Sequence, residues 1–182
     1  MRHSVTIMLF CAAGALAPSI EAQVRPTTGP VIESAGPIFD VPDPTFTTPV
    51  DLTYKVVFEV ANGASEPDRL NQQLGTIARF LNMHAQAGVP ATQVRVAAVV
   101  HGTAGKEMLS DEAYREEFGT ANPNTALIRE LTATGAQIVL CGQTAAARGI
   151  DRRRLQPGVK VALSAMTALF VFQEEGYRIN LW

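Results

Sequence analysis

Short runs of apolar, strand-forming residues alternate with amphipathic segments from about residue 51 to the end of the chain. Such runs are expected to form strands at Tyr54–Val60, Gln93–Val100, Gln137–Leu140, Val159–Leu163 and Tyr177–Leu181. Strands that are apolar on both faces are typical of parallel sheets with a helical layer on each side. The pattern therefore predicts an α/β fold with a mostly parallel, five-stranded sheet.

Helical spacing and capping residues predict where the first helices lie. Ser65, with Asp68 three positions on, resembles a capping box, so the first helix is expected to begin there and to end near Ala87. The stretch 103–120 is less regular, and we expect short helices there that cover the mouth of a site.

Three more helices are predicted in the second half of the chain. Asn122 and the proline after it are expected to open one helix, and the small residues 143–148 form another. Ser164 is expected to cap a helix that runs through Glu175. Its inward residues are predicted to be Met166, Leu169 and Phe170.

The N-terminus has the pattern of a secretory signal. Basic residues precede an apolar run, and small residues follow it, so residues 1–22 are predicted to be a signal peptide cleaved after Ala22. An uncleaved anchor and lipidation at Cys11 are the alternatives. Residues 23–50 are rich in proline and are interpreted as an arm or linker, and 51–182 as one domain. Within the arm, five apolar residues are able to dock: Val31, Ile32, Ile38, Phe39 and Phe46. The protein is thus expected to be exported, periplasmic or secreted, without a stable membrane span after cleavage.

The composition narrows the function classes. Hydrophobic residues make up 47% of the chain and charged residues 18%, and the formal net charge is -2. This is a globular composition without the basic bias of nucleic-acid-binding proteins, so no nucleic-acid partner is expected.

The cysteine content poses the main functional question. The chain has two cysteines, and removal of the signal peptide leaves Cys141 alone. A single thiol forms no internal disulfide in an oxidising compartment. Cys141 is therefore either buried and inert or used in chemistry.

Polar residues follow three of the predicted strands where ligands bind in open α/β sheets. Asn62 follows the first strand, His101 the second and Cys141 the third. A helix that starts just after Cys141 would favour a thiolate, which makes it a candidate nucleophile, and His101 is a candidate to pair with it or move a proton. The alternatives are that Cys141 is buried and only fills space, and that His101 is a structural residue with a hydrogen bond to a loop carbonyl. The candidate ligand-binding residues are Asn62, Gly102, Gly142, Gln143 and Thr144.

Other kinds of site are poorly supported. One mature cysteine and two distant histidines do not make a structural zinc site. The Asn62–Ser65 turn lacks the lysine and glycine spacing of a phosphate loop. No cofactor is predicted.

The sequence resembles the DsrE/DsrF-like family of sulfur-relay proteins over roughly residues 51–182. The likeness lies in Val99–Gly102, in the segment Leu140–Ala145 with its Cys-Gly-Gln-Thr-Ala sequence, and in the closing stretch around Pro157–Leu169. The resemblance implies a three-layer α/β/α sandwich, assembly into trimers or hexamers, and a persulfide on Cys141. The signal peptide and the proline-rich arm depart from the cytoplasmic members.

Two classes of function follow. The first is a sulfur carrier that holds a persulfide on Cys141, with a protein or small thiol as donor and acceptor. The second is a non-catalytic binding or assembly module with a buried cysteine, which includes a soft metal site shared between subunits through Cys141 and His101.

Overall fold

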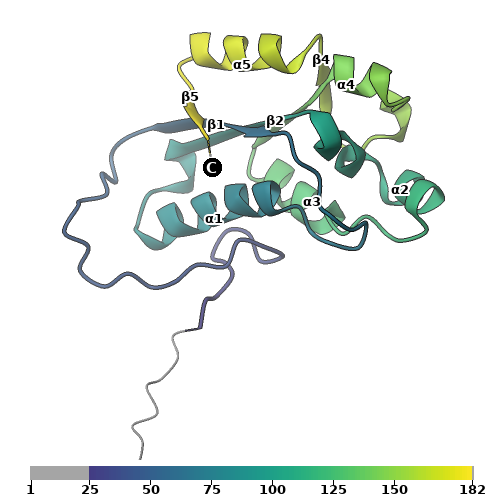
Figure 1. Ribbon diagram of the computed structural model, residues 1–182. Coiled ribbons are helices and arrows are strands. Elements are labelled where there is room, and N and C mark those ends of the chain that lie inside the picture. The colour runs from purple at the N-terminus through teal and green to yellow at the C-terminus, as the bar shows by residue number, and fades with distance from the viewer. Residues whose placement is uncertain (1–24, 182) are drawn as a thin grey trace, which may run out of the picture.

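The computed structural model describes residues 25–181. Its centre is a five-stranded sheet in the order β4-β3-β2-β1-β5, and all neighbouring strands are parallel (Figure 1). The predicted α/β class is confirmed, and the strands lie within one or two residues of their predicted bounds. They are β1 (Tyr54–Val60), β2 (Val94–Val100), β3 (Gln137–Cys141), β4 (Lys160–Ala162) and β5 (Arg178–Asn180).

Helices cover both faces of the sheet and form the three-layer sandwich. Figure 1 shows α5 on one side of the strands and α1 and α3 on the other, with α2 and α4 near one end of the sheet. The helices are α1 (Gln72–Gln86), α2 (Asp111–Phe118), α3 (Thr125–Ala133), α4 (Gly142–Ala147) and α5 (Ala165–Glu174). Short 3-10 helices are η1 (Ala91–Gln93), η2 (Gly102–Met108) and η3 (Arg152–Arg154).

The side chains of the central strands alternate between two apolar cores. Even-numbered residues of β1, β2 and β3, such as Phe58 and Leu140, pack against α1 and α3. Odd-numbered residues, such as Val57, Val99 and Cys141, belong to the core beneath α5. The thiol of Cys141 therefore lies on the α5 face of the sheet.

The strand register brings three strand ends together on that face. Val60 is level with Val100, and Val100 is level with Leu140. The odd-numbered positions next to them are Glu59, His101 and Cys141, each from a different neighbouring strand or strand end. Parallel strands in this register place these side chains side by side at the carboxyl edge of the sheet.

Two helices begin later than predicted. α1 starts at Gln72, because Asn71 is its N-cap and accepts hydrogen bonds from the amides of Gln73 and Leu74. Ser65 does not cap it. α3 begins at Thr125, three residues after Asn122. The carboxamide oxygen of Asn122 accepts from the amide of Asn124 in the turn before the helix, and its nitrogen donates to the carbonyls of Glu107 and Leu109 in the preceding loop.

The predicted inward face of α5 is right for Leu169, which is partly buried against the core beneath the helix, and wrong for Met166 and Phe170. Met166 and Phe170 are 79% and 63% exposed, and the buried residues are instead Ala165, Ala168 and Phe172. Ser164 does cap the helix as predicted, with its hydroxyl accepting from the Thr167 amide. The small residues Ala165 and Ala168 allow the N-terminal half of α5 to lie close to the sheet, while Phe172 fills the space beneath its C-terminal half.

Part of the proline-rich arm is built into the domain. The carboxamide of Asn82 in α1 accepts from the amides of Val31 and Ile32 and donates to the carbonyls of Ile32 and Gly36. Ile32 is fully buried as a result. Phe39 and Phe46, which the sequence analysis allowed to dock, are exposed. The predicted signal peptide lies outside the described residues.

Candidate active site

Cys141 lies at the last position of β3, directly before α4. It is 5% exposed and is the N-cap residue of α4. Its side chain lines a cavity of about 220 Å³ at the carboxyl edge of the sheet. The cavity is lined by Glu59, His101, Cys141, Gln143, Ser164, Ala165, Met166 and Leu169.

The surroundings of Cys141 favour the thiolate. Burial alone would raise the pKa of the thiol, but hydrogen bonds outweigh it and the pKa is lowered. The donors are the amide and hydroxyl of Thr144 and the amides of Ala165 and Gln143. These amides come from the first turns of α4 and α5, so the N-termini of two helices converge on one sulfur.

Thr144 and Gly142, which were predicted to bind a ligand, instead fix the position of the backbone around Cys141. The hydroxyl of Thr144 accepts a hydrogen bond of 3.1 Å from the amide of Gly102. This bond ties the segment after β2 to α4. A side chain at Gly142 would lie 2.4 Å from the carbonyl oxygen of Ala162, so only glycine fits between β3 and β4 at this point. Both residues therefore fix the geometry around Cys141.

His101 lies in the same cavity and is paired with a carboxylate that the sequence analysis did not identify. Its Nε2 atom is 2.9 Å from Oε1 of Glu59. The side chains are 27% and 39% exposed, respectively. The bond to Glu59 holds the imidazole against the β1 side of the cavity that contains the thiol.

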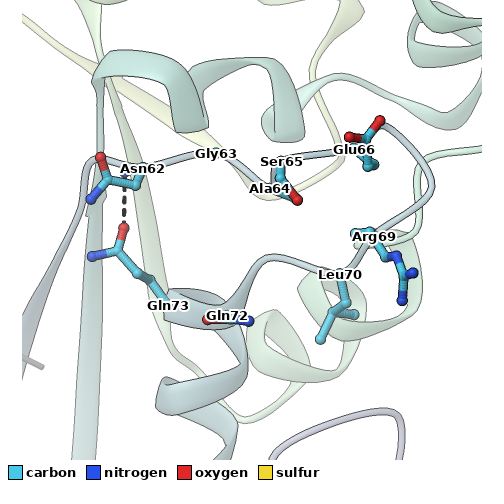
Figure 2. A pocket seen from close by; sticks show the side chains of 9 residues that line it. All are labelled: Asn62, Gly63, Ala64, Ser65, Glu66, Arg69, Leu70, Gln72 and Gln73. Atoms are coloured by element: carbon cyan, nitrogen blue, oxygen red, sulfur yellow. Dashed lines mark hydrogen bonds between the residues drawn. The ribbon is translucent and has the colours of Figure 1, made fainter.

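Asn62, which was predicted to share the crevice, lies in a different cavity. Figure 2 shows the loop between β1 and α1 folding back on itself, with 62–66 on one side and 69–73 on the other. This cavity of about 790 Å³ is larger than the one at Cys141. It contains no cysteine or histidine, so the smaller cavity has the stronger chemical case.

Hydrogen bonds from behind hold the loop around the larger cavity. The Gln73 side chain accepts from the amide of Asn62, and the carboxylate of Glu107 accepts from the amide of Ala64 at 2.6 Å. The hydroxyl of Tyr114 in α2 donates to the carbonyl of Pro67. The short helices in 103–120 thus form as predicted, but they support this loop and do not cover the cavity at Cys141.

Within residues 25–181, no group of three or more His, Cys, Asp or Glu side chains is arranged to hold a metal ion. No helix in that part of the chain has the length and apolar character needed to cross a membrane.

Two residues of the Cys141 cavity, Glu59 and Ala165, were not predicted from the sequence as site residues. Glu59 is a charged residue at an odd-numbered position near the end of the apolar strand β1, and its alternation with Val57 would have placed it on the face of Cys141. Ala165 was read only as part of a helix. Its amide reaches Cys141 because β4, which precedes α5, pairs with β3. The local sequence does not indicate which strands pair.

The model of the DsrE/DsrF-like family matches residues 55–180, which is more than half of the chain and includes Glu59, His101 and Cys141. No curated protein matches the chain.

Solved structures with the same fold come from an archaeon and a bacterium. The protein of unknown function MTH1491 from Methanobacterium thermoautotrophicum is 21% identical, with a TM-score of 0.53, and the match covers 71% of this chain and 99% of that one. The ychN protein from E. coli is 16% identical, with a TM-score of 0.50 and the same coverage. At these identities the likeness concerns the fold alone.

Proposed function

Because this chain belongs to the DsrE/DsrF-like family, which is associated with sulfur relay, we propose that it carries sulfur as a persulfide on Cys141. The observation that supports this most is the lowered pKa of a thiol that lines a cavity at the carboxyl edge of the sheet. A persulfide carrier needs a thiolate to accept sulfur and a space beside it for the donor.

The proposed reaction is an exchange of one sulfur–sulfur bond for another. The Cys141 thiolate attacks the outer sulfur of a donor persulfide, RS–SH, so that the RS–SH bond breaks and a new bond forms to Cys141. The donor leaves as a thiolate, which takes up the proton released by the Cys141 thiol. Donor persulfide and protein thiol thus become donor thiol and protein persulfide, without any external oxidant or reductant.

His101 is the proposed carrier of that proton. It lies in the cavity with Cys141, and an imidazole both accepts and donates protons near neutral pH. It would take the proton from the thiol and return it to the leaving sulfur. The reverse sequence passes the outer sulfur to an acceptor, which we propose to be a partner protein or a small thiol.

The loading step is testable by mass. The native protein should gain the mass of one sulfur atom after incubation with the persulfide of 2-mercaptoethanol, and a reductant should remove it. Cys141→Ser should gain none while keeping the wild-type circular dichroism spectrum. If the native wild-type protein gains no sulfur and its thiol reacts with alkylating agents only after denaturation, Cys141 is a buried structural residue and the protein is a binding or assembly module.

We further propose that the protein is a homo-oligomer, a trimer or hexamer, assembled through the outer face of α5. Leu163, two residues before α5, and Met166 and Phe170 on the helix are 73%, 79% and 63% exposed, and we term them the α5 apolar face. Large apolar side chains that are exposed together are typical of protein interfaces. Replacing Met166 and Phe170 with serine should lower the mass measured by light scattering, whereas Met83→Ser on α1 should not.

Export of the protein to the periplasm or the medium is also proposed, from the signal-like residues 1–22. The mature protein should then begin at about residue 23, which N-terminal sequencing of the protein recovered from an exporting cell would check. An intact Met1 would contradict it.

A further inference from the structure

Glu59 adds a charge to the Cys141 cavity that the exchange of sulfur does not require. Resting on the proposed function, we infer that Glu59 is a specificity residue: it selects thiol-bound sulfane sulfur, which enters the cavity in the protonated, uncharged form RS–SH, and disfavours dianionic donors such as thiosulfate.

The charged groups around the cavity carry no net positive charge. β1 contributes the Glu59 carboxylate, the residue after β2 is His101, and β3 contributes the thiol of Cys141. Glu59 and His101 are in direct contact at 2.9 Å, so together they carry a charge of zero or minus one. Among the described residues that line the cavity there is no lysine or arginine. No lysine or arginine among these described lining residues therefore attracts an anion.

The opposite wall and the amides add to this discrimination. α5 contributes the apolar side chains of Met166 and Leu169, which give no hydrogen bond to replace the water around an anion. The amides that favour negative charge, from Gln143, Thr144 and Ala165, are already used by the Cys141 sulfur. An incoming dianion would meet a thiolate and a carboxylate without compensation.

An uncharged persulfide avoids these costs. Its terminal S–H and sulfur are weakly polar and suit the apolar wall, and the leaving thiolate takes its proton from His101 as described above. Thiosulfate also reacts in balance, since the Cys141 thiolate would take the outer sulfur and release sulfite. In that case, however, two negative charges must enter the cavity and two must leave it.

A pair of alkylating agents measures the charge at the thiol without any sulfur donor. Iodoacetamide is neutral and iodoacetate is an anion of similar size, so the ratio of their rates with Cys141 reports the local potential. In Glu59→Gln the carboxamide oxygen still accepts from Nε2 of His101, but the charge is gone. The preference for iodoacetamide should fall about threefold to tenfold at low ionic strength. Glu66→Gln, at the rim of the other cavity, is the matched control and should leave the ratio unchanged.

The wild-type protein gives a second readout that needs no variant. Because the Glu59 side chain is 39% exposed, added salt should screen its charge and reduce the preference for iodoacetamide. A ratio insensitive to both salt and Glu59→Gln would overturn the inference. So would an equal change in Glu66→Gln.

The donors themselves complete the test. The persulfide of 2-mercaptoethanol should load wild-type Cys141 faster than thiosulfate does, and Glu59→Gln should narrow the difference by raising the thiosulfate rate. If both donors load normally but the variant changes neither ratio, the role of Glu59 is wrong and the carrier function stands. If neither donor loads while the alkylation ratio shifts as expected, the carrier function is wrong, and the donor assignment falls with it.

Discussion

Removing the hydroxyl of Thr144 should slow the reactions of Cys141 without removing the thiol. This hydroxyl is one of the groups that lower the pKa of Cys141, and it also accepts from the amide of Gly102. Thr144→Val keeps the shape of the side chain and loses both interactions. A hydrogen bond to a charged group contributes roughly 1.5–3 kcal/mol, which corresponds to a thiolate population about tenfold to a hundredfold smaller.

The effect on the rate is smaller than the effect on the population. A more basic thiolate is a better nucleophile, with a Brønsted coefficient of about 0.4–0.5, which offsets close to half of the loss on a logarithmic scale. At a pH where the thiol is mostly protonated in both proteins, we expect alkylation by iodoacetamide to be about fourfold to fifteenfold slower in Thr144→Val.

The assay is the rate of iodoacetamide labelling, followed by intact mass across a series of pH values. The control is Thr76→Val, because Thr76 is a surface residue of α1 whose hydroxyl donates only to the carbonyl of Gln72. The labelling curve of Thr144→Val should move to higher pH, and that of Thr76→Val should coincide with the wild type. An unchanged curve for Thr144→Val, with the fold intact, would refute the argument that hydrogen bonds activate Cys141.

Three further outcomes are expected. Burial raises the pKa of Glu107, so its contribution to the free energy of unfolding is present below about pH 4.5 and is lost as pH rises through the raised value. Glu107→Gln should therefore flatten the decline of stability with pH, measured by urea titrations at several pH values. A parallel decline in the wild type and the variant would count against a raised pKa of Glu107. Asn82→Ala leaves buried backbone groups of the arm unpaired and should cost about 2–4 kcal/mol in urea denaturation; a loss below 1 kcal/mol would argue against a docked arm. Gly142→Ala collides with the Ala162 carbonyl and should lower both the melting temperature and the rate of Cys141 labelling, and wild-type values for both would contradict the close packing of β3 and β4.

Much of the fold was readable from the sequence because strands buried on both faces leave a strong signal. The runs that became β1, β2 and β3 are almost continuously apolar, which is what a covered parallel sheet requires. The order β4-β3-β2-β1-β5 was not predicted, since pairing partners depend on tertiary packing rather than on local pattern.

The wrong predictions of where α1 and α3 begin share a physical cause: polar side chains make tertiary hydrogen bonds as readily as local ones. Asn122 has the residue type of a helix cap, and its side chain both accepts from the amide of Asn124 before α3 and satisfies the carbonyls of Glu107 and Leu109. Asn71 looks unremarkable in the sequence and caps α1. In α5 seven of the ten residues are apolar, so periodicity did not distinguish the inner face from the outer one, and the buried residues are Ala165, Ala168 and Phe172.

The candidate site was predicted in part. The strand ends of His101 and Cys141 do meet in one cavity, because β2 and β3 are neighbours. Asn62 lies two residues beyond the end of β1 and lines the cavity of the β1–α1 loop instead. Strand alternation stops at Val60, so the sequence did not indicate the direction of the Asn62 side chain. Counting the alternation along β1 would have included Glu59 in the site.

The most direct test of the central claim is a cycle of loading and discharge on the native protein. The protein is treated with the persulfide of 2-mercaptoethanol, freed of excess donor, weighed by intact mass spectrometry, mixed with a small acceptor thiol and weighed again. The account predicts a gain of one sulfur atom that is lost to the acceptor, with neither change in Cys141→Ser. A native protein that gains no sulfur, or that gains the same mass in Cys141→Ser, would contradict it.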